Sequence, residues 1–504
     1  MGGTAPWGRV VLCGRVAADE AGNEVVNAGD CLYAPHILRS VCHVRTRAVV
    51  SSCTSDHAVI LSVHGDAYLY GRNAEAQCGV PVTSTSDAAS LWLYDARRLD
   101  KEHDFVPPIA PGVSIHTGAT GAMHTLLVTT QGELYAAGSN EFGQCGLGTL
   151  ATCVPFQLVP MTERVVDVAC GRAASVVVTE SGAVYTMGSS EDGMLGTCAA
   201  SWHHTGPSDV TYDLARHPVR IPNLGGIVRV TCGERHVAAL DRDGYMYVWG
   251  HASLARLGCG TQIDQPFPVR IPQFVRKNKQ DRIRDVVAGT TCTMCVDNQE
   301  RLWIAGTWRL KDDGGPDQSF LIYKPLAELA DYDVHEMAAG ADTMQCLVKP
   351  TDEHGNTHMQ AWGWGEGAWH AELGSSGGTT APVPTMLHIL EPLKVVAVAS
   401  GRHTSYWLVQ PDSVYAELPR YPATIESSSV CMVCRRSGDD DDATLLECDR
   451  CENPYHLSCL TPPLAAVPEG EWLCVECRKD SGHNDDGNDH EGANHPIMDQ
   501  QHER

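Results

Sequence analysis

The chain contains 504 residues, more than one ordinary hydrophobic core holds, so the sequence predicts at least two domains. Its formal net charge of −25 argues against a protein that wraps DNA through its overall electrostatic field. There is no run of eighteen apolar residues, and the opening MGGTAPWGRVV lacks the charged-then-apolar pattern of a signal peptide. We therefore expect an intracellular protein without a membrane span.

The positions of the cysteines and of the charged residues predict the redox compartment of the protein and the charge of its partner. Fourteen of the 21 cysteines are scattered singly, as at Cys170, Cys232 and Cys295, which is typical of buried thiols in a reducing compartment. Residues 426–504 contain 18 acidic and 6 basic residues, against 44 and 31 in the first 425. So acidic a C-terminal part should favour a basic partner, the alternative being that some of this charge only solvates a tail.

Residues 1–410 contain seven copies of one unit, clearest in IVRVTCGERHVAALDRDGYMYVWG (Ile227–Gly250). The unit has an apolar strand, a Gly-x-x-His turn, a second strand, a glycine-containing hairpin and a third strand that ends in glycine. The copies are separated by about fifty to seventy residues, the period of propeller blades, and short strands between glycine turns indicate antiparallel sheets. The sequence therefore predicts an all-β fold with a seven-bladed β-propeller at residues 1–410.

The phase of the repeat also predicts how the ring closes. The repeat should have seven third strands that end in glycine, one for each blade. The count reaches seven only if the segment Val10–Gly14, which precedes the first complete copy, is included. This N-terminal strand should therefore complete the last blade beside Val395–Val409, which removes exposed sheet edges. The basic segment Phe274–Arg284 stands out between two copies, and it fits either a phosphate-binding or import signal or a merely solvated loop.

The histidine of the turn is retained in four copies and replaced in three. We expect these histidines to be buried and to bond neighbouring backbone, because residues on separate blades cannot converge on one metal ion. The histidine positions are His57, His124, His236 and His403, and the replacements are Ala174, Cys292 and Thr343.

The copies resemble the repeat of the regulator of chromosome condensation family, a seven-bladed propeller. The resemblance covers roughly residues 7–410 and includes the motif after the third strand, as in NEFGQCGLG (Asn140–Gly148), EDGMLG (Glu191–Gly196) and HASLARLGCG (His251–Gly260). The best-known member exchanges nucleotide on a Ran-type small GTPase. This implies an alternative function for the propeller, although a fold does not carry an activity with it, and a protein-interaction platform is the expected role.

Residues 411–429 contain prolines and a serine run and are predicted to form a linker, and residues 480–504 a disordered acidic tail. Between them, residues 430–479 contain eight residues at metal-ligand spacing, in the order four cysteines, one histidine and three cysteines. Eight ligands imply two structural Zn²⁺ ions with four protein ligands each, so neither ion can activate water. In so short a segment, metal must supply most of the folding free energy.

The string from Cys431 to Cys477 resembles a PHD finger over its whole length. Trp472, two residues before Cys474, matches the structural tryptophan of that family, which a RING finger, the alternative with a role in ubiquitin transfer, lacks. The resemblance implies alternating ligation. One zinc ion would be held by Cys431, Cys434, His456 and Cys459, and the other by Cys448, Cys451, Cys474 and Cys477.

The resemblance also implies a ligand, the N-terminal tail of histone H3. Such a peptide pairs as an added strand with a sheet edge, here expected at Thr444–Glu447, while pockets read its side chains. Asp449 matches the position that contacts the arginine at the second residue of the tail, and the carbonyl groups of 468–470 would accept its α-amine. The contact residues implied outside the acidic loop are Leu445, Leu446, Glu447, Asp449, Pro468, Glu469 and Gly470.

The residues of the finger favour an unmodified lysine at the fourth position of the tail. Readers of trimethyl-lysine use an aromatic cage, whose tryptophan normally lies two residues before the zinc histidine, where this chain has Pro454. In place of aromatic residues the chain has an acidic run that includes Asp440, Asp441 and Asp442. Carboxylates suit an ammonium group with three N–H donors. The alternative is that this run is a solubilising loop.

These observations predict a nuclear, chromatin-associated binding protein, with the cytoplasm as the alternative location. Its finger would read histone H3, and its propeller would engage a further protein such as a small GTPase. No nucleophile with an adjacent base, phosphate-binding loop or open metal site stands out, so we expect no enzyme active site. Direct contact with DNA is left open.

Overall fold

The computed structural model divides into two compact units, one of residues 1–410 and 417–426 and the other of residues 411–416 and 427–504. No helix among the described residues has the length and apolar character needed to cross a bilayer. The structure describes residues 7–16, 31–42, 44–82, 92–95, 109, 113–197, 202–204, 210–275, 279–308, 319–350, 359–365, 370–374, 381–421, 431–434, 445–450, 453–468 and 472–480.

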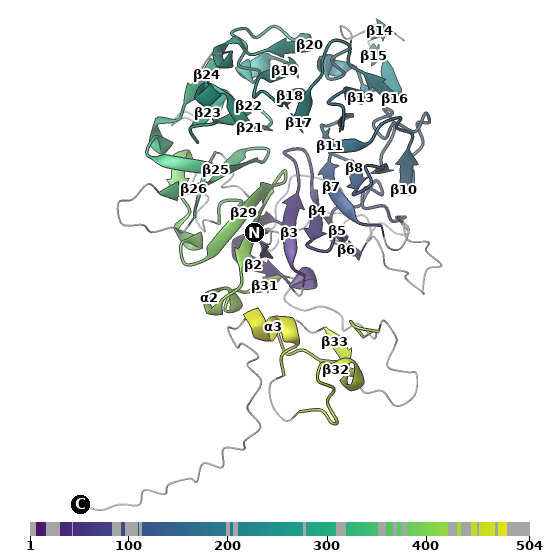
Figure 1. The fold of residues 1–504 in the computed structure, drawn as a ribbon, viewed down its shortest axis with the longest axis vertical. Helices are drawn as coiled ribbons and strands as arrows, with labels where there is room; N and C mark the ends of the chain where they lie inside the picture. The colour runs from purple at the N-terminus through teal and green to yellow at the C-terminus, as the bar shows by residue number, and fades with distance from the viewer. Residues whose placement is uncertain are drawn as a thin grey trace, which may run out of the picture. The chain divides into compact units, whose positions relative to one another are not determined.

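The first unit is a seven-bladed β-propeller, which confirms the predicted fold (Figure 1). Blades 1 to 3 comprise β3 (Thr46–Val50), β4 (His57–Ser62), β5 (Ala67–Gly71) and β6 (Trp92–Asp95); β7 (Ile115–Thr120), β8 (His124–Thr129), β9 (Leu134–Gly138) and β10 (Cys153–Val159); and β11 (Val165–Cys170), β12 (Ala174–Thr179), β13 (Val184–Ser189) and β16 (Leu214–Arg220).

Three further blades repeat this order. They comprise β17 (Ile227–Cys232), β18 (His236–Asp241), β19 (Met246–Gly250) and β20 (Gln265–Arg270); β21 (Ile283–Ala288), β22 (Cys292–Asp297), β23 (Leu302–Gly306) and β24 (Phe320–Pro325); and β25 (Tyr332–Ala339), β26 (Thr343–Pro350), β27 (Gln360–Gly365) and β28 (Ala381–Met386). A separate hairpin between β13 and β16 pairs β14 (Trp202–His204) with β15 (Val210–Tyr212).

Short 3-10 helices connect some of these strands. They are η1 (Arg39–Val41), η2 (Glu191–Gly193), η3 (Ser253–Ala255), η4 (Pro272–Phe274), η5 (Lys279–Asp281), η6 (Ala327–Leu329) and η7 (His388–Leu390).

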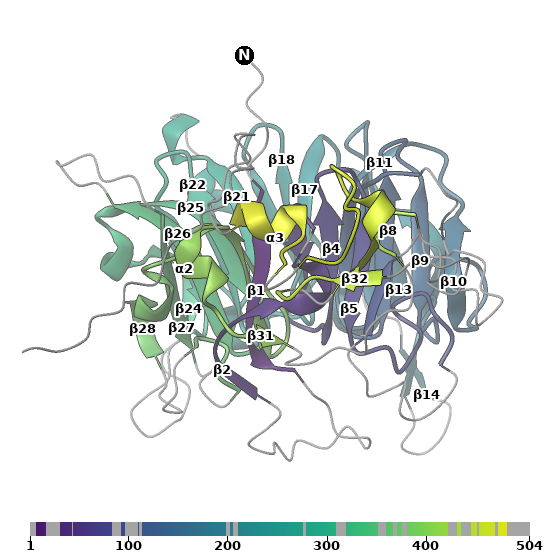
Figure 2. The same cartoon turned by 90° about the horizontal axis from the view of Figure 1, so that it is seen from below.

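The seventh blade joins the two ends of the first unit. Strand β1 (Arg9–Arg15) pairs antiparallel with β30 (Thr404–Gln410), which pairs with β29 (Lys394–Ser400), so the predicted closure is confirmed. Figure 2 shows β1 and β2, in purple, in the same part of the ring as the green strand β31, which belongs to the same sheet. Strand β2 (Cys31–Leu38) follows β1 in the sheet.

The segment 411–429, expected as a linker, contains regular structure. Strand β31 (Arg420–Tyr421) pairs in parallel with the end of β2, and a short helix, α2 (Ser413–Ala416), precedes it. The Tyr421 ring packs on the core of blades 7 and 1, and its hydroxyl lies 3.5 Å from the carbonyl oxygen of Val16. The last blade is therefore extended by a fifth strand, which comes from residues that follow the final repeat.

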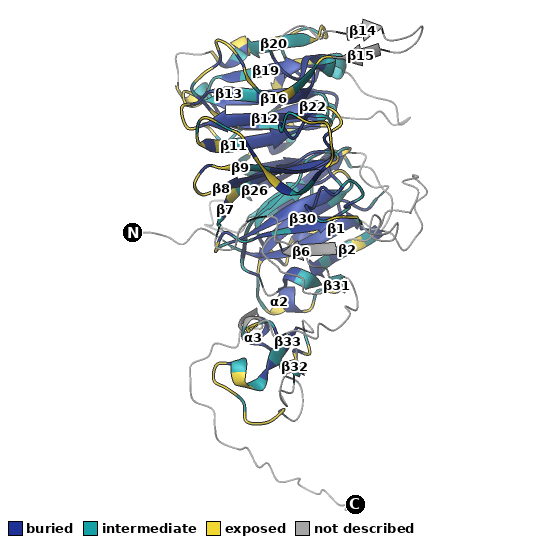
Figure 3. Ribbon diagram, turned by 90° about the vertical axis from the view of Figure 1, so that its right-hand side faces the viewer, coloured by how far each residue is buried: buried dark blue, intermediate teal, exposed yellow. Residues whose placement is uncertain are grey.

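The core of the ring lies between neighbouring blades. The second strand of a blade is buried on both faces, as all six residues of β4, β8, β12 and β22 are. Between blades 3 and 4, the fully buried Trp249 packs with valines such as Val176 and Val237. Figure 3 shows the strands of the ring mostly dark blue and the exposed residues mainly in the connections. Apolar strands in a closed ring thus need no covering layer of helices.

The repeat histidines link one blade to the next. The Nε2 atoms of His57, His124 and His236 lie 2.7, 2.8 and 2.7 Å from the hydroxyl oxygens of Thr125, Ser175 and Thr293. Each hydroxyl donates to a backbone carbonyl, so the imidazole Nε2–H must be the donor to the hydroxyl. The expected backbone partner is therefore wrong, since a hydroxyl lies between the imidazole and the carbonyl. Burial lowers the pKa of His57 and His236 to about 3, which keeps both rings neutral.

His403 does not belong to this series. Thr404 pairs with Gly14 in blade 7 as His57 pairs with Gly71 in blade 1, so Thr404 occupies the repeat position and His403 precedes it. The ring of His403 instead lies 4.3 Å, centroid to centroid, from that of His370. Its Nδ1 lies 3.7 Å from Oε1 of Glu372.

Ionisation of Glu372 should make the stability of the propeller depend on pH. The side chain of this residue is 1% exposed, and no side chain among the described residues donates a hydrogen bond to either carboxylate oxygen. Burial therefore raises the pKa of Glu372 to about 8. Because the folded state favours the protonated acid, the stability it contributes is complete below pH 4.5 and is lost as the pH rises towards 8.

We expect Glu372→Gln to stabilise the propeller at pH 8, by on the order of 3 kcal/mol, and to have little effect at pH 4.5. Glutamine has nearly the same shape and cannot ionise. Denaturant unfolding at both pH values measures the difference. A destabilised variant at pH 8 would instead mean that an ionised Glu372 is stabilised by a protonated His403.

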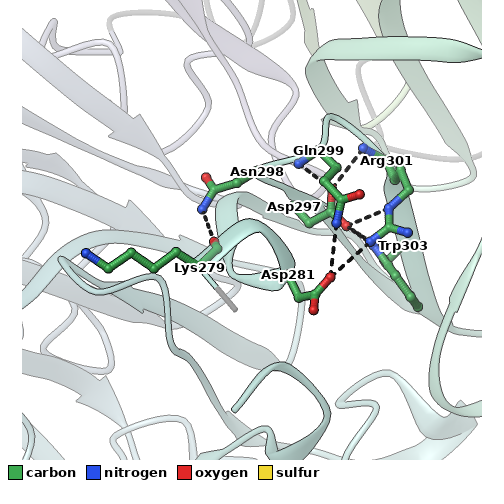
Figure 4. Close-up of polar contacts among 7 residues, drawn as sticks. All are labelled: Lys279, Asp281, Asp297, Asn298, Gln299, Arg301 and Trp303. Atoms are coloured by element: carbon green, nitrogen blue, oxygen red, sulfur yellow. Dashed lines mark hydrogen bonds and ion pairs between the residues drawn. The ribbon is translucent and has the colours of Figure 1, made fainter. Parts of the chain in front are cut away.

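Asp297 holds the hairpin between β22 and β23 (Figure 4). This side chain is 1% exposed, and its Oδ1 accepts the backbone N–H groups of Gln299 and Arg301 at 2.9 and 3.1 Å. Its Oδ2 accepts from Arg301 Nε and Nη2 at 2.9 and 2.7 Å and from Trp303 Nε1 at 3.0 Å. Five donors thus converge on one buried carboxylate.

Asp297→Ala is expected to destabilise the propeller by about 2–4 kcal/mol, because the substitution leaves three N–H groups without their acceptor and leaves the partly exposed Arg301 guanidinium only Asp281, 3.5 Å away. Denaturant unfolding measures the loss. Asp243→Ala is the matched control, since that side chain is 69% exposed and lies 3.9 Å from Arg282, so removal should cost less than about 1 kcal/mol. Equal stability of the two variants would contradict the prediction.

Candidate functional site

The second unit is built around a two-stranded sheet. Strand β32 (Leu445–Glu447) pairs antiparallel with β33 (Pro454–His456), which leads into η8 (Leu457–Cys459). A C-terminal helix, α3 (Val475–Asp480), follows Trp472. The backbone N–H of Met432 donates to the carbonyl of Pro454 at 2.8 Å, which fixes the first cysteine pair beside β33.

The structure brings together the four residues that the sequence assigns to a first zinc ion. The ligand atoms of Cys431, Cys434, His456 and Cys459 all lie within 4.8 Å of one another. The Nδ1 of His456 lies 3.2 Å from the Cys434 sulfur and 3.9 Å from the Cys459 sulfur, so Nδ1 is the nitrogen directed at the cluster. Three thiols and one imidazole suit a closed tetrahedral zinc site.

Backbone N–H groups stabilise the thiolate form of Cys431. The N–H groups of Val433 and His456 point at it from 3.4 and 3.3 Å. Burial alone raises the pKa of Cys431, but hydrogen bonds from the backbone, first that of Cys434, bring it down to about 7. Because zinc binds the thiolate form, these N–H groups favour metal binding.

Three of the four residues assigned to a second ion also lie together. The sulfur atoms of Cys448, Cys474 and Cys477 are within 4.8 Å of one another, and all three residues are buried. The backbone N–H of Cys474 donates to the Cys448 sulfur at 3.2 Å. Cys451, the fourth predicted ligand, lies outside the described residues.

Trp472 packs on β33 and is hydrogen-bonded to Asp449, which follows β32. Its side chain is buried, and its ring meets that of Tyr455 edge-on at 5.7 Å. Its carbonyl accepts the backbone N–H of Asp449 at 3.0 Å, and its own N–H donates to the Asp449 carboxylate. Asp449, predicted to contact the arginine of a peptide, is exposed and already has one oxygen engaged within the finger.

The predicted peptide edge coincides in part with β32. Among the described residues this strand pairs only with β33, so its other edge has no strand partner. Leu446 is buried, Leu445 half-buried and Glu447 exposed. Pro468 is half-buried in the loop before Trp472. The remaining predicted contacts, Asp440, Asp441, Asp442, Glu469 and Gly470, lie outside the described residues, as does Thr444.

The first unit has a charged central channel that the sequence analysis missed. The first strands of successive blades lie nearest the centre in Figure 1 and contact one another. Asp167, Arg229, Asp285 and Glu336 each follow a bulge in such a strand. Arg229 Nε lies 2.6 Å from Asp285 Oδ1, and burial raises the pKa of Asp167 to about 6. A cavity of about 350 Å³ is lined by residues of five blades, among them Arg229, Asp285 and Glu336.

The basic segment Phe274–Arg284 makes contacts within the ring where it is described. Arg282 Nη1 donates to the Asp243 carbonyl at 3.0 Å, and its guanidinium lies 4.9 Å from the centre of the Tyr245 ring. Arg284 Nη2 donates to the carbonyl of Val334. Residues 276–278, which include two basic residues, lie outside the described part.

Both parts of the chain match known protein families. Residues 7–407 match the RCC1-like domain, and the chain therefore belongs to that family. Residues 431–477 match the PHD-finger, which confirms the predicted class of the C-terminal module and agrees with its cysteine and histidine clusters.

The propeller is similar to several curated proteins. It is 26% identical over 398 residues to the RCC2 homolog of Xenopus laevis, an alignment that covers 74% of this chain and 71% of the frog protein. Human RCC2 is 25% identical over 371 residues, which cover 69% of this chain and 64% of that protein, slightly less than two thirds. The E3 ubiquitin-protein ligase HERC2 of Homo sapiens shares 25% identity, but only 7% of its length is covered.

Solved structures show the same fold. Human WBSCR16 matches with a TM-score of 0.58 and 18% identity, covering 80% of this chain and 99% of that chain. Prp20p of Saccharomyces cerevisiae, whose structure was described with its binding properties to Gsp1p and histones, matches with a TM-score of 0.62 and 17% identity, covering 81% and 92%.

Proposed function

We propose that this protein is a nuclear chromatin reader whose PHD-type finger, folded on two Zn²⁺ ions, binds the N-terminal tail of histone H3. The observation that carries the proposal is the edge of β32, next to the metal clusters, that pairs with no other strand in the described part of the finger. An extended peptide gains main-chain hydrogen bonds by adding a strand to such an edge. The acidic composition of residues 426–504 suits a basic tail.

The finger is proposed to prefer a tail whose fourth-position lysine is unmethylated. Tyr455 and Trp472 are the only tyrosine, tryptophan or phenylalanine residues between 431 and 480, and their rings pack on each other. Neither is therefore available to build a cage of ring faces around a trimethylammonium group. The acidic run Asp439–Asp442 supplies acceptors for an ammonium group with three N–H donors.

Calorimetry with H3 tail peptides tests both parts of this proposal. The full-length protein should bind the unmodified peptide at least about tenfold more tightly than the peptide trimethylated at the fourth position. Replacing Asp440, Asp441 and Asp442 by asparagine should remove most of this preference.

The matched control replaces three acidic residues of the tail, Asp485, Asp486 and Asp489, by asparagine, which lowers the charge equally outside the finger. Tighter binding of the trimethylated peptide, or an equal effect of the two triple variants, would refute the lysine preference. The absence of binding to every histone tail would refute the reader function.

The propeller is proposed to be a platform for another protein and not an enzyme. This chain shares a fold with Prp20p at 17% identity, which is not evidence that it shares the binding properties of Prp20p. The alternative, exchange of nucleotide on a Ran-type GTPase, is tested by mixing the full chain with Ran loaded with a fluorescent nucleotide. Release no faster than the spontaneous rate is expected, and acceleration would assign exchange activity.

A further inference from the structure

Three potential metal ligands meet on the propeller, away from the finger. Asp192 lies in η2 of blade 3, whereas His251 follows β19 and Asp264 precedes β20 in blade 4. Their ligand atoms all lie within 4.8 Å of one another. His251 Nδ1 lies 3.5 Å from Asp192 Oδ1 and 3.0 Å from Asp264 Oδ1. The set therefore spans the seam between two blades.

The imidazole nitrogen of this set faces the two carboxylates. Among the described residues, His251 Nδ1 makes no hydrogen bond of good geometry, and its nearest polar neighbours are Asp264 Oδ1 and Asp192 Oδ1. The carboxylate of Asp264 is held in place, since its Oδ1 accepts the backbone N–H of Ala252 at 2.8 Å. An imidazole nitrogen that faces two carboxylates without a well-aligned hydrogen bond to either is placed as a metal ligand is, with room for an ion between the three groups.

The spacing of the three ligand atoms matches that around one metal ion. With metal–ligand bonds of about 2.1 Å, neighbouring ligand atoms are about 3.0 Å apart in octahedral and about 3.4 Å apart in tetrahedral coordination. The two measured distances from His251 Nδ1, 3.0 and 3.5 Å, are close to these values. With all three ligand atoms within 4.8 Å of one another, small side-chain movements bring them to one ion.

We propose that Asp192, His251 and Asp264 form a binding site for a divalent transition-metal ion, with water completing its coordination. One imidazole and two carboxylates, without a thiolate, suit Zn²⁺ or Mn²⁺. The two carboxylates neutralise the double charge of the ion. Mg²⁺ and Ca²⁺ prefer sites made of oxygen atoms alone and bind this set more weakly.

The ion links two blades at a seam that lacks the histidine bond found at others. His57, His124 and His236 join blades 1 to 2, 2 to 3 and 4 to 5, but Ala174 and Val237 occupy the corresponding positions between blades 3 and 4. The described polar links across this seam include the bond from Trp249 Nε1 to the Met194 carbonyl at 2.9 Å. A metal bridge therefore strengthens the seam at the rim.

Arg235 competes with the ion for Asp192. Its Nη1 lies 3.7 Å from Asp192 Oδ2, and its side chain is 35% exposed, so it can turn into solvent when an ion binds. Removing this guanidinium removes a positive charge beside the site. Arg235→Ala is therefore expected to tighten metal binding, an effect that a purely structural role of the cluster does not produce.

Equilibrium dialysis of the full-length protein against buffered Zn²⁺, followed by elemental analysis, tests the site. The wild-type protein should bind one more zinc ion than His251→Ala. Asp264→Asn should raise the free zinc concentration needed for that ion at least about tenfold, and Arg235→Ala should lower it. Zinc should also raise the unfolding temperature of the wild-type propeller more than that of His251→Ala.

His388→Ala is the matched control, because His388 lies 3.4 Å from the single carboxylate of Glu391, away from blades 3 and 4, and belongs to no cluster of three ligands among the described residues. It should bind as many ions as the wild-type protein. The finger and the histidines of the C-terminal tail are the same in every variant, so only differences between variants count. Equal zinc binding by wild type, His251→Ala and Asp264→Asn would overturn the proposal.

Discussion

Replacing Cys448 by serine is expected to unfold the finger and leave the propeller intact. Cys448 is fully buried, its sulfur accepts the N–H of Cys474, and it lies within 4.8 Å of the sulfur atoms of Cys474 and Cys477. A serine hydroxyl does not replace a thiolate on zinc, and structural zinc contributes about 10–16 kcal/mol of apparent binding free energy in small fingers. Elemental analysis should show less zinc per chain, and binding of the H3 peptide should fall more than about hundredfold.

Cys259→Ser is the matched control for this experiment. This cysteine lies in the propeller, is partly exposed, and its sulfur is 3.8 Å from the carbonyl of Thr261. The variant should keep its full zinc content and bind the peptide normally. If Cys448→Ser kept both zinc and peptide binding, the finger would have to fold without its second cluster.

The second large effect is expected at the closure of the ring. Leu12 is fully buried on β1, where it pairs with Tyr406 of β30 and with His36 of β2. Leu12→Asp places an unpaired charge in the apolar core between blade 7, which joins the two ends of the propeller, and blade 1, at an expected cost of more than about 4 kcal/mol. Hydrogen exchange should show blade 7 losing protection before blades 3 to 5.

Val228→Asp is the control for Leu12→Asp, because Val228 lies on β17 and is 48% exposed. This change should cost less than about 1 kcal/mol. Uniform loss of protection in all blades of Leu12→Asp would show that the ring unfolds as one cooperative unit. Stability equal to that of Val228→Asp would show that closure contributes little.

The sequence was sufficient to predict the ring and its closure. Seven copies of one unit recur at blade spacing, and the strand at Val10–Gly14 supplies the seventh glycine-ended strand. The order of cysteines and histidine was likewise sufficient to predict that the C-terminal module is a PHD finger. These features are local patterns, which can be recognised without knowledge of the packing between blades.

Contacts between blades could not be predicted in the same way. The partner of His57 is the hydroxyl of Thr125, 68 residues away, and no local pattern indicates which face of the next blade it occupies. In the last copy the histidine lies one residue closer to the glycine than in the Gly-x-x-His turns of other copies, so Thr404, and not the predicted His403, holds the repeat position. The channel charges follow bulges, which reverse the alternation of a strand and are not visible in its sequence.

In the finger, the sequence identified ligand types but not how the backbone supports them. The N–H groups directed at Cys431 and Cys448 belong to residues whose side chains give no sign of this role. Asp449 was expected to face a peptide, yet its carboxylate also holds the backbone of Trp472. A substitution at Asp449 would therefore change both the fold of the finger and its peptide contact.

The pairing of β1 with β30 has a consequence during protein synthesis. Strand β1 leaves the ribosome before the other strands of the ring, and its partner β30 emerges only after almost four hundred further residues have been added. Until then the nascent chain exposes unpaired strand edges at both sides of a growing, incomplete circle, which makes it prone to aggregation. Chaperones that shield such edges should matter more for this protein than for one whose first domain is complete after a hundred residues.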